Sequence, residues 1–250
     1  MKLVSWNLWS DNKDQIKSVN SLLEQQPDIL CLQEVSQKCL QYIKKLPDYD
    51  FIVARDFNET KKKTKKDFSL VVMSKFPILN KDGENKFSVE HLTRRSVWDL
   101  INRWQESLEF QFADVEYNGK KHRIFNIHLE VAAGPKLRFQ QLKLTLQHFN
   151  PDMENIICGD LNIYASVWVN LILGWIMGYR PNEFFTNERK LFEKEFKKAG
   201  LKNVFRGKAT YPKYRLQLDH ILLPESVNLR HSEVMLSVNG SDHRAIQAVI

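Results

Sequence analysis

The alternation of short apolar runs with amphipathic stretches along the whole chain constrains the fold most strongly. The runs 3–6, 29–32 and 155–158 have the length and composition of buried strands. In 16–23 and 137–148, by contrast, residues that would face a core recur at helical spacing. Strands interleaved with helices predict a layered α/β or α+β domain rather than an all-helical one.

The same patterns predict the remaining elements. Further strands are expected at 49–54, 68–73, 109–115, 123–128, 218–222 and 245–250. The basic run 61–66 is predicted to be a loop, and Tyr117-Asn118-Gly119 a hairpin turn. A charged helix is expected within 184–199. Because no repeat, low-complexity tract or linker divides the chain, residues 1–250 are interpreted as one domain with one large core.

The formal net charge of +7 indicates attraction to anionic ligands, although a soluble basic protein without such a ligand is equally compatible with it. The cysteines Cys31, Cys39 and Cys158 lack paired spacing and are predicted to be buried thiols in a reducing compartment. Strand-like sequence begins at Lys2, which leaves no room for a signal peptide. The apolar segment 167–179 is too short to span a bilayer. A soluble, cytoplasmic monomer is expected.

Polar side chains stand where the predicted strands end. These residues are Asn7, Gln33, Glu34, Asn126, His128, Asp160, Asn162, Asp219, His220, Asp242 and His243. Because layered α/β proteins collect ligands at one edge, beyond the strand ends, we expect most of these side chains to form one site. His220 is the exception, since its side chain alternates away from that of Asp219 and is expected to pack in the interior. Trp6 is expected in the core for the same reason.

The residue types suit phosphoester hydrolysis. A phosphodiester repels an incoming nucleophile, so the enzyme must supply a hard cation, donors for the nonbridging oxygens and a base for water. Glu34 is an oxygen ligand of the kind that Mg²⁺ prefers. Asp219 or Asp242 could hold His243 in the tautomer that accepts a proton. The chain has no Gly-rich phosphate loop, zinc-binding helix, paired Cys-x-x-Cys or nucleophile elbow, which argues against those chemistries.

Five motifs occur in an order that resembles the endonuclease/exonuclease/phosphatase superfamily. They are Ser5-Trp6-Asn7, Leu32-Gln33-Glu34-Val35, Asn126-Ile127-His128-Leu129-Glu130, Gly159-Asp160-Leu161-Asn162 and Ser241-Asp242-His243. Leu218-Asp219-His220 stands at the place of the family's late aspartate. The resemblance implies a four-layered sandwich of two mixed β-sheets packed face to face and flanked by helices. It also implies Mg²⁺ or Mn²⁺ as cofactor, with Glu34 as the principal ligand and Asn7 and Asp242 completing or supporting the metal shell.

The resemblance further implies the catalytic roles. His243, paired with Asp219, would act as general base or as a phosphate-stabilising acid. Asp160 would orient or deprotonate the attacking water, and Asn162 and His128 would bind nonbridging oxygens. Whether Asp160 or His243 takes the proton is left open.

The substrate is less constrained. His128-Leu129-Glu130 followed by Arg138 and Gln141 resembles the 5′-tyrosyl-DNA phosphodiesterases, which favours a nucleic-acid phosphodiester. The alternative is a lipid or small-molecule phosphoester, as in sphingomyelinases, with 167–179 as a hydrophobic lip or a peripheral membrane contact. The run 61–66 is either a solvated loop or a phosphate-tracking one. A binding module with a degenerate site is the non-enzymatic alternative, and the completeness of the motifs argues against it.

Overall fold

The computed structural model of the chain describes residues 1–61, 64–81, 85–88, 104–105, 109–164, 170–171, 174–177, 179–236 and 239–250. Its helices are α1 (Gln15–Leu23), α2 (Gln37–Ile43), α4 (Pro135–Gln147) and α6 (Glu188–Lys198), with short 3-10 helices η1 (Pro181–Glu183) and η2 (Pro212–Tyr214). Its strands are β1 (Lys2–Asn7), β2 (Ile29–Ser36), β3 (Asp50–Lys61), β4 (Thr64–Ser74), β5 (Lys86–Ser88), β6 (Trp104–Gln105), β7 (Glu109–Tyr117), β8 (Lys120–His128), β9 (Glu154–Asp160), β10 (Leu201–Asn203), β11 (Asp219–Pro224), β12 (His231–Val234) and β13 (Ile246–Val249).

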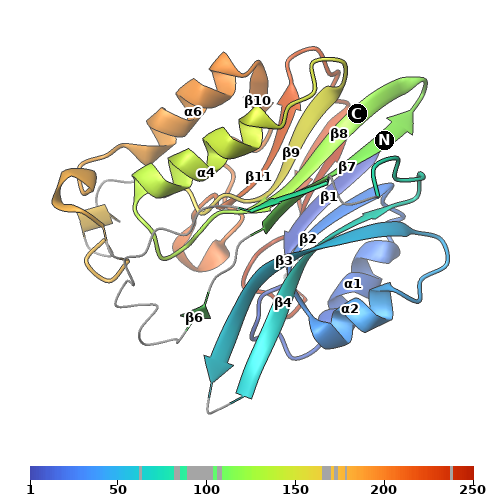
Figure 1. Ribbon diagram of the computed structural model, residues 1–250, viewed down its shortest axis with the longest axis horizontal. Helices are drawn as coiled ribbons and strands as arrows, with labels where there is room; N and C mark the ends of the chain where they lie inside the picture. Colours follow the sequence, from blue (N-terminus) through green and yellow to red (C-terminus); the bar gives the residue numbers. More distant parts are fainter. Residues whose placement is uncertain are drawn as a thin grey trace.

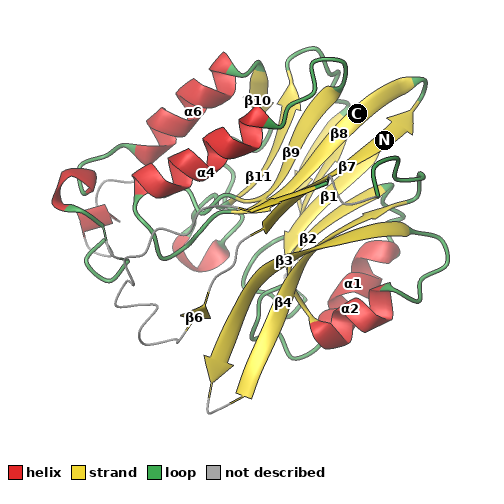
Figure 2. Cartoon of the chain, viewed as in Figure 1, coloured by secondary structure: helices red, strands yellow, loops and turns green. Residues whose placement is uncertain are grey.

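These strands form two sheets. In the described part of the chain, one sheet has the order β12-β13-β1-β2-β4-β3-β6 and the other β10-β11-β9-β8-β7-β5. Strand β1 runs parallel to β2, and β8 runs parallel to β9, whereas the neighbouring pairs β2–β4 and β11–β9 are antiparallel. Both sheets are therefore mixed. Helices α1 and α2 lie beside the first sheet and α4 and α6 beside the second (Figures 1 and 2), which confirms the predicted four-layered sandwich.

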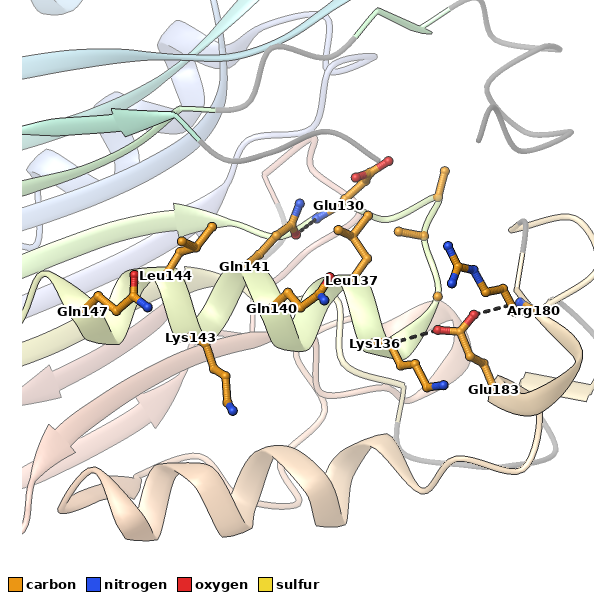
Figure 3. A pocket seen from close by; sticks show the side chains of 13 residues that line it. Glu130, Lys136, Leu137, Gln140, Gln141, Lys143, Leu144, Gln147, Arg180 and Glu183 are labelled. Atoms are coloured by element: carbon orange, nitrogen blue, oxygen red, sulfur yellow. Dashed lines mark hydrogen bonds between the residues drawn. The ribbon is translucent and has the colours of Figure 1, made fainter. Parts of the chain in front are cut away.

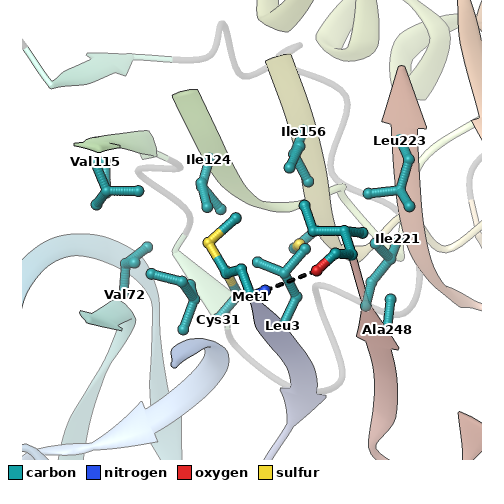
Figure 4. Close-up of a cluster of buried hydrophobic side chains, with 14 of the residues drawn as sticks. Met1, Leu3, Cys31, Val72, Val115, Ile124, Ile156, Ile221, Leu223 and Ala248 are labelled. Carbon is teal, nitrogen blue, oxygen red and sulfur yellow. Dashed lines mark hydrogen bonds between the residues drawn. The ribbon is translucent and has the colours of Figure 1, made fainter. Parts of the chain in front are cut away.

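Three apolar clusters separate the layers. The largest lies between the sheets and contains Leu3 from β1 and Ile124 from β8 (Figure 4). Cys31 and Cys158 belong to this cluster, and the three cysteines are free and buried, as predicted. A second cluster packs the sheet containing β8 against α4 and α6, and a third packs the sheet containing β1 against α1 and α2. Trp6 lies in the third cluster, where the alternation of strand side chains placed it.

Several local predictions are confirmed. Helix α1 begins after Asp14, whose carboxylate accepts a hydrogen bond from the Lys17 backbone N–H at 3.1 Å. Helix α4 has Pro135 in its first turn, where a missing N–H costs nothing. Strands β7 and β8 form the expected hairpin, because Asn118 and Gly119 adopt the positive φ angles of 51° and 72° that a tight turn between twisted strands needs.

Two predictions at the first sheet need correction. The described part of the run 61–66 is strand rather than loop, because β3 continues to Lys61 and β4 begins at Thr64, and these two residues are paired. Residues 62–63 lie outside the described residues. The backbone pairing of β3 with β4 continues as far as Lys61 and Thr64, and the run of lysines in the sequence does not reveal this pairing. Helix α2 was not expected either, because it is only seven residues long and follows directly on β2.

The apolar segment 167–179 lies partly outside the described residues. Within its described part, Met177 and Tyr179 pack with Phe184 in a small cluster, whereas Trp175 is 74% exposed. Phe185, which follows this segment in the sequence, is 76% exposed. In the part of the chain that the structure describes, no helix has the length and apolarity needed to cross a bilayer.

Candidate active site

The predicted site residues lie at one edge of the two sheets. Asn7 ends β1, His128 ends β8, and Asp160 ends β9. Antiparallel β11 begins at this edge, so its first residue, Asp219, is paired with Asp160. The parallel pairs β1–β2 and β8–β9 direct their carboxyl ends the same way, which is why side chains that are distant in sequence meet there.

Asn7 connects the two sheets at this edge. Its Nδ2 donates to Oε1 of Glu34 at 2.8 Å and to Oδ2 of Asp160 at 3.1 Å. Its Oδ1 accepts from the backbone N–H of Trp9 at 2.9 Å, which fixes the orientation of the amide. Asn7, Glu34 and Asp160 are thus brought together, as the sequence predicts.

Glu34 lies at an irregularity of β2. The pairing of β2 with β4 shifts register between Leu32 and Val35, and Glu34 has a left-handed φ of +55°. The bulge turns the carboxylate toward the site, where Oε2 accepts from the backbone N–H of Ser10 at 2.6 Å. Burial raises the pKa of Glu34, although His128 and the Asn7 amide act in the opposite direction.

His243 and Asp219 form a buried pair. Nδ1 of His243 lies 2.8 Å from Oδ2 of Asp219, and Nε2 lies 3.8 Å from Oδ2 of Asp160. The Oγ1 of Thr210 accepts from the backbone N–H of Asp219 at 3.0 Å and fixes the start of β11. Burial lowers the pKa of His243, but the carboxylates of Asp219 and Asp160 outweigh this effect and raise it to about 10.

His128 is held in the same way by Asp56, a residue that the sequence reasoning missed. Nδ1 of His128 lies 2.9 Å from Oδ1 of Asp56, and Nε2 lies 3.8 Å from Oδ2 of Asp160. Burial lowers the pKa of His128, but Asp56, Asp160 and Glu34 together raise it to about 10. The sequence signal was weak, because Asp56 follows Arg55 directly after the apolar run 51–54. In the structure Asp56 lies at a second register shift, between Arg55 and Asn58.

The loop after β9 places Asp160 and Asn162. Gly159 has φ +144°, and a Cβ there would lie 1.8 Å from the carbonyl oxygen of Ile127, so only glycine lets β8 and β9 approach this closely. Oδ1 of Asp160 accepts from the Asn162 backbone N–H at 3.0 Å, and Nδ2 of Asn162 donates to the carbonyl of Leu129 at 2.9 Å. Burial raises the pKa of Asp160, opposed by the charge of His243.

Asp242 borders the site beside His243. Its Oδ1 lies 3.9 Å from Nε2 of His243, and burial raises its pKa. Tyr211, which the sequence reasoning also missed, has its ring centroid 5.0 Å from that of His243. Burial and its contact with Asp242 raise the pKa of Tyr211 to about 12. His220, in contrast, points away toward α6, where Nε2 lies 2.7 Å from Nη1 of Arg189, so its predicted packing role is confirmed.

The donor set fits a divalent cation. Asp160, Asp219 and His243 form a buried group whose ligand atoms lie within 4.8 Å of one another and could hold a metal ion. Nδ1 of His243 already contacts Oδ2 of Asp219, so this nitrogen and this oxygen are engaged with each other. The carboxylate and amide oxygens around Glu34 are therefore the better ligands for Mg²⁺. Oδ1 of Asp242 is buried and has no hydrogen-bond partner among the described residues, although the Asp242 carboxylate interacts with Tyr211. A cation would also favour the ionised form of carboxyls whose pKa burial has raised.

A cavity of about 610 Å³ adjoins this edge along α4 (Figure 3). Its wall includes Glu130, two residues beyond His128, and the basic side chains Lys136, Lys143 and Arg180. Behind it, the buried Arg138 guanidinium donates to the carboxylate of Glu188 at 2.7 Å and to the backbone carbonyls of residues 130, 131 and 133. The ion pair therefore fixes the loop that follows His128.

Residues 4–243 match the Endonuclease/Exonuclease/phosphatase family, so the chain belongs to this family of phosphoesterases. The fold is similar to a family protein from Leptotrichia buccalis, with TM-score 0.68 and 16% identity over 100% of this chain and 99% of that one. It is also similar to D. rerio TDP2 complexed with a single-strand DNA product, with TM-score 0.60 and 18% identity over 99% of this chain and 97% of that one.

A third similar structure is the mannosyl-6-phosphatase Bt3783 of Bacteroides thetaiotaomicron, with TM-score 0.62 and 15% identity over 100% of this chain and 98% of that one. Comparison with curated protein sequences gives no match. At these identities the similar structures establish the fold, and the substrate has to be argued from the site.

Proposed function

We propose that the chain is a divalent-metal-dependent phosphodiesterase that hydrolyses nucleic acid by in-line attack of water. The observation that carries this proposal is the convergence of two imidazoles on one carboxylate oxygen. Nε2 of His128 and Nε2 of His243 each lie 3.8 Å from Oδ2 of Asp160, and each ring is anchored from behind by its own buried acid. Two cationic donors beside one carboxylate suit a tetrahedral anion that is attacked by water.

The pKa values support one assignment of the proton transfers. Because the pKa of His243 and that of His128 are both about 10, both rings are protonated at neutral pH and act as donors to phosphate oxygens. Asp160 is then the group that orients water and accepts its proton, and burial, which raises its pKa, makes it a better acceptor. As the water oxygen bonds to phosphorus, the bond to the leaving oxygen breaks and His243 supplies a proton to that oxygen. The Asn162 amide is a further donor to the phosphoryl group.

Glu34, Asn7 and Asp242 would hold the metal. When bound there, Mg²⁺ or Mn²⁺ neutralises phosphate charge and polarises the phosphoryl group. Asn7 orients the Glu34 carboxylate through its 2.8 Å hydrogen bond. All of these residues come from one chain, so a monomer suffices for the chemistry.

A metal-dependence assay tests the reaction. Glu34→Ala, Asp160→Ala and His243→Ala are each expected to lower kcat by at least about 100-fold, since each removes a charge or proton-transfer group from the transition state. EDTA should abolish activity, and excess Mg²⁺ should restore it. Leu236→Ser, at an exposed position of the same chain, is the matched control and should behave as wild type. Activity that survives EDTA, or that persists in Asp160→Ala, would overturn the proposal.

A nucleic-acid substrate is supported by charge. Lys136, Lys143 and Arg180 line the cavity beside His128, and the whole chain carries a formal charge of +7. Phosphate contacts make binding strongly salt-dependent, so replacing the three cations by alanine should flatten the salt dependence of affinity for single-stranded DNA. If the dependence of DNA affinity on salt concentration is unchanged in this variant, the three cations of the cavity do not contact the DNA phosphates.

A lipid phosphoester is the second candidate, and exposed apolar side chains favour it. Trp175 is 74% exposed and Phe185 76% exposed, next to the basic Arg180. Aromatic residues beside cations suit the headgroup region of a bilayer. Flotation with anionic liposomes would support this candidate if binding depends on Trp175 and Phe185, and absence of binding would end it. A substrate panel of single-stranded DNA, RNA, 5′-tyrosyl DNA and sphingomyelin then separates the two functions.

A further inference from the structure

Gln15, the first residue of α1, bonds to three backbone groups in two segments, the loop after β1 and the end of β2. Its side chain is buried, with 4% of the residue exposed. Nε2 donates to the carbonyl of Trp9 at 3.0 Å and to the carbonyl of Glu34 at 2.8 Å. Oε1 accepts from the backbone N–H of Ser36 at 2.8 Å. Among the described residues, the hydrogen bonds of this amide therefore all go to main chain near the proposed metal ligands.

These backbone groups need a side-chain partner because β2 is irregular there. The pairing with β4 shifts register between Leu32 and Val35, and Glu34 adopts φ +55°. A left-handed conformation in a residue other than glycine is strained and persists only where its surroundings impose it. By bonding to Glu34 and Ser36 on either side of Val35, Gln15 satisfies two backbone groups of this irregular stretch.

The bond to Trp9 joins the bulge to the loop after β1. Two groups from the end of β1 and from this loop donate to the Glu34 carboxylate. They are Nδ2 of Asn7 and the backbone N–H of Ser10. Trp9 itself donates its backbone N–H to Oδ1 of Asn7. The Gln15 amide thus links the main chain of the loop after β1 to the main chain of the Glu34 bulge, in addition to the bonds that the Glu34 carboxylate itself accepts.

The opposite side of the bulge is held from the core. Nδ2 of Asn126, on β8, donates to the carbonyls of Leu32 and Val71 at 3.0 Å each. Oδ1 of Asn126 accepts from Nε2 of Gln33 at 2.8 Å. Asp56, on β3, accepts from the Glu34 backbone N–H at 2.9 Å. Gln15 therefore shares the support of the bulge with Asn126 and Asp56, and it is the member of the three that also bonds to the loop after β1.

We propose that Gln15 is a positioning residue for the metal site, which sets the geometry of Glu34 relative to Asn7 without contacting metal or substrate. The inference rests on the proposed function, because it takes Glu34 and Asn7 as metal ligands. Partners that orient metal ligands commonly contribute 10–100-fold to metal affinity. Gln15 has this role even though it lies in a helix that contributes no side chain to the site.

Gln15→Met removes the hydrogen bonds and keeps the length of the side chain. We expect it to weaken Mn²⁺ binding about 10–100-fold, as measured by isothermal titration calorimetry or by the electron paramagnetic resonance of free Mn²⁺. At saturating metal kcat should recover most of its wild-type value, because the reacting groups are intact. Val19→Ala, in the buried face of the same helix, is the matched control and should lower stability while leaving Mn²⁺ affinity unchanged.

A second substitution covers the case in which Gln15→Met does not fold. Gln15→Glu keeps the acceptor for the Ser36 N–H and loses the donor to Glu34 and Trp9, so it should also weaken Mn²⁺ binding. Wild-type affinity in a folded Gln15 variant would overturn the inference. Glu34→Ala distinguishes a failure of the inference about Gln15 from a failure of the proposed function. If Glu34→Ala binds Mn²⁺ with wild-type affinity, Glu34 is not a metal ligand and the proposed metal site is wrong.

Discussion

Replacing Arg138 by methionine should destabilise the protein strongly. Arg138 and Glu188 are both fully buried, with Nε of Arg138 2.7 Å from Oε1 of Glu188, and the guanidinium also donates to three backbone carbonyls and to the Tyr179 hydroxyl. Arg138→Met would leave the Glu188 charge in the interior, where the backbone N–H of Tyr164 is its remaining hydrogen-bond donor among the described residues. Loss of one partner from such a pair costs about 3–5 kcal/mol, a large part of a typical total stability of roughly 5–15 kcal/mol.

Urea denaturation followed by circular dichroism measures this loss, and a double-mutant cycle identifies its cause. If the unpaired charge is responsible, adding Glu188→Gln to Arg138→Met should recover part of the lost stability, because the second substitution removes that charge while keeping an acceptor for Tyr164. A single variant that loses less than about 1 kcal/mol, or a double variant less stable than Arg138→Met, would refute the reasoning. Activity should fall as well, because Arg138 holds the loop after His128.

Three further outcomes are expected. Gly159→Ala should cost about 3 kcal/mol or more in urea denaturation, because its Cβ would lie 1.8 Å from the Ile127 carbonyl oxygen. Asp56→Asn should lower the pKa of His128 from about 10 toward its ordinary value, as measured by NMR titration, and reduce kcat; an unchanged pKa would show that other carboxylates suffice. Burial lowers the pKa of His220 well below the ordinary value, so the unfolded chain binds a proton that the folded chain rejects. Stability should therefore fall as the pH drops below about 6.5, less steeply in His220→Gln than in wild type.

Much of the site could be predicted from the sequence because strand ends are recognisable. Asn7, His128 and Asp160 directly end apolar runs, and parallel pairing places such ends at one edge. Asp56 could not be found in this way, because it lies in the middle of β3 and reaches His128 only through the packing of one sheet on the other. Tyr211 was missed for a related reason, since its contact with His243 depends on how two loops meet.

The sequence by itself determined the layered fold, the family and the residues that gather at the sheet edge, because periodicity and motif order are local properties of the chain. The tertiary structure decided what local patterns cannot encode. It carried β3 to Lys61 and began β4 at Thr64, paired His128 with Asp56, and set Glu34 in a bulge bonded to Gln15. The physical reason is that hydrogen bonds and charge interactions between distant segments depend on distances that exist only once the two sheets have packed.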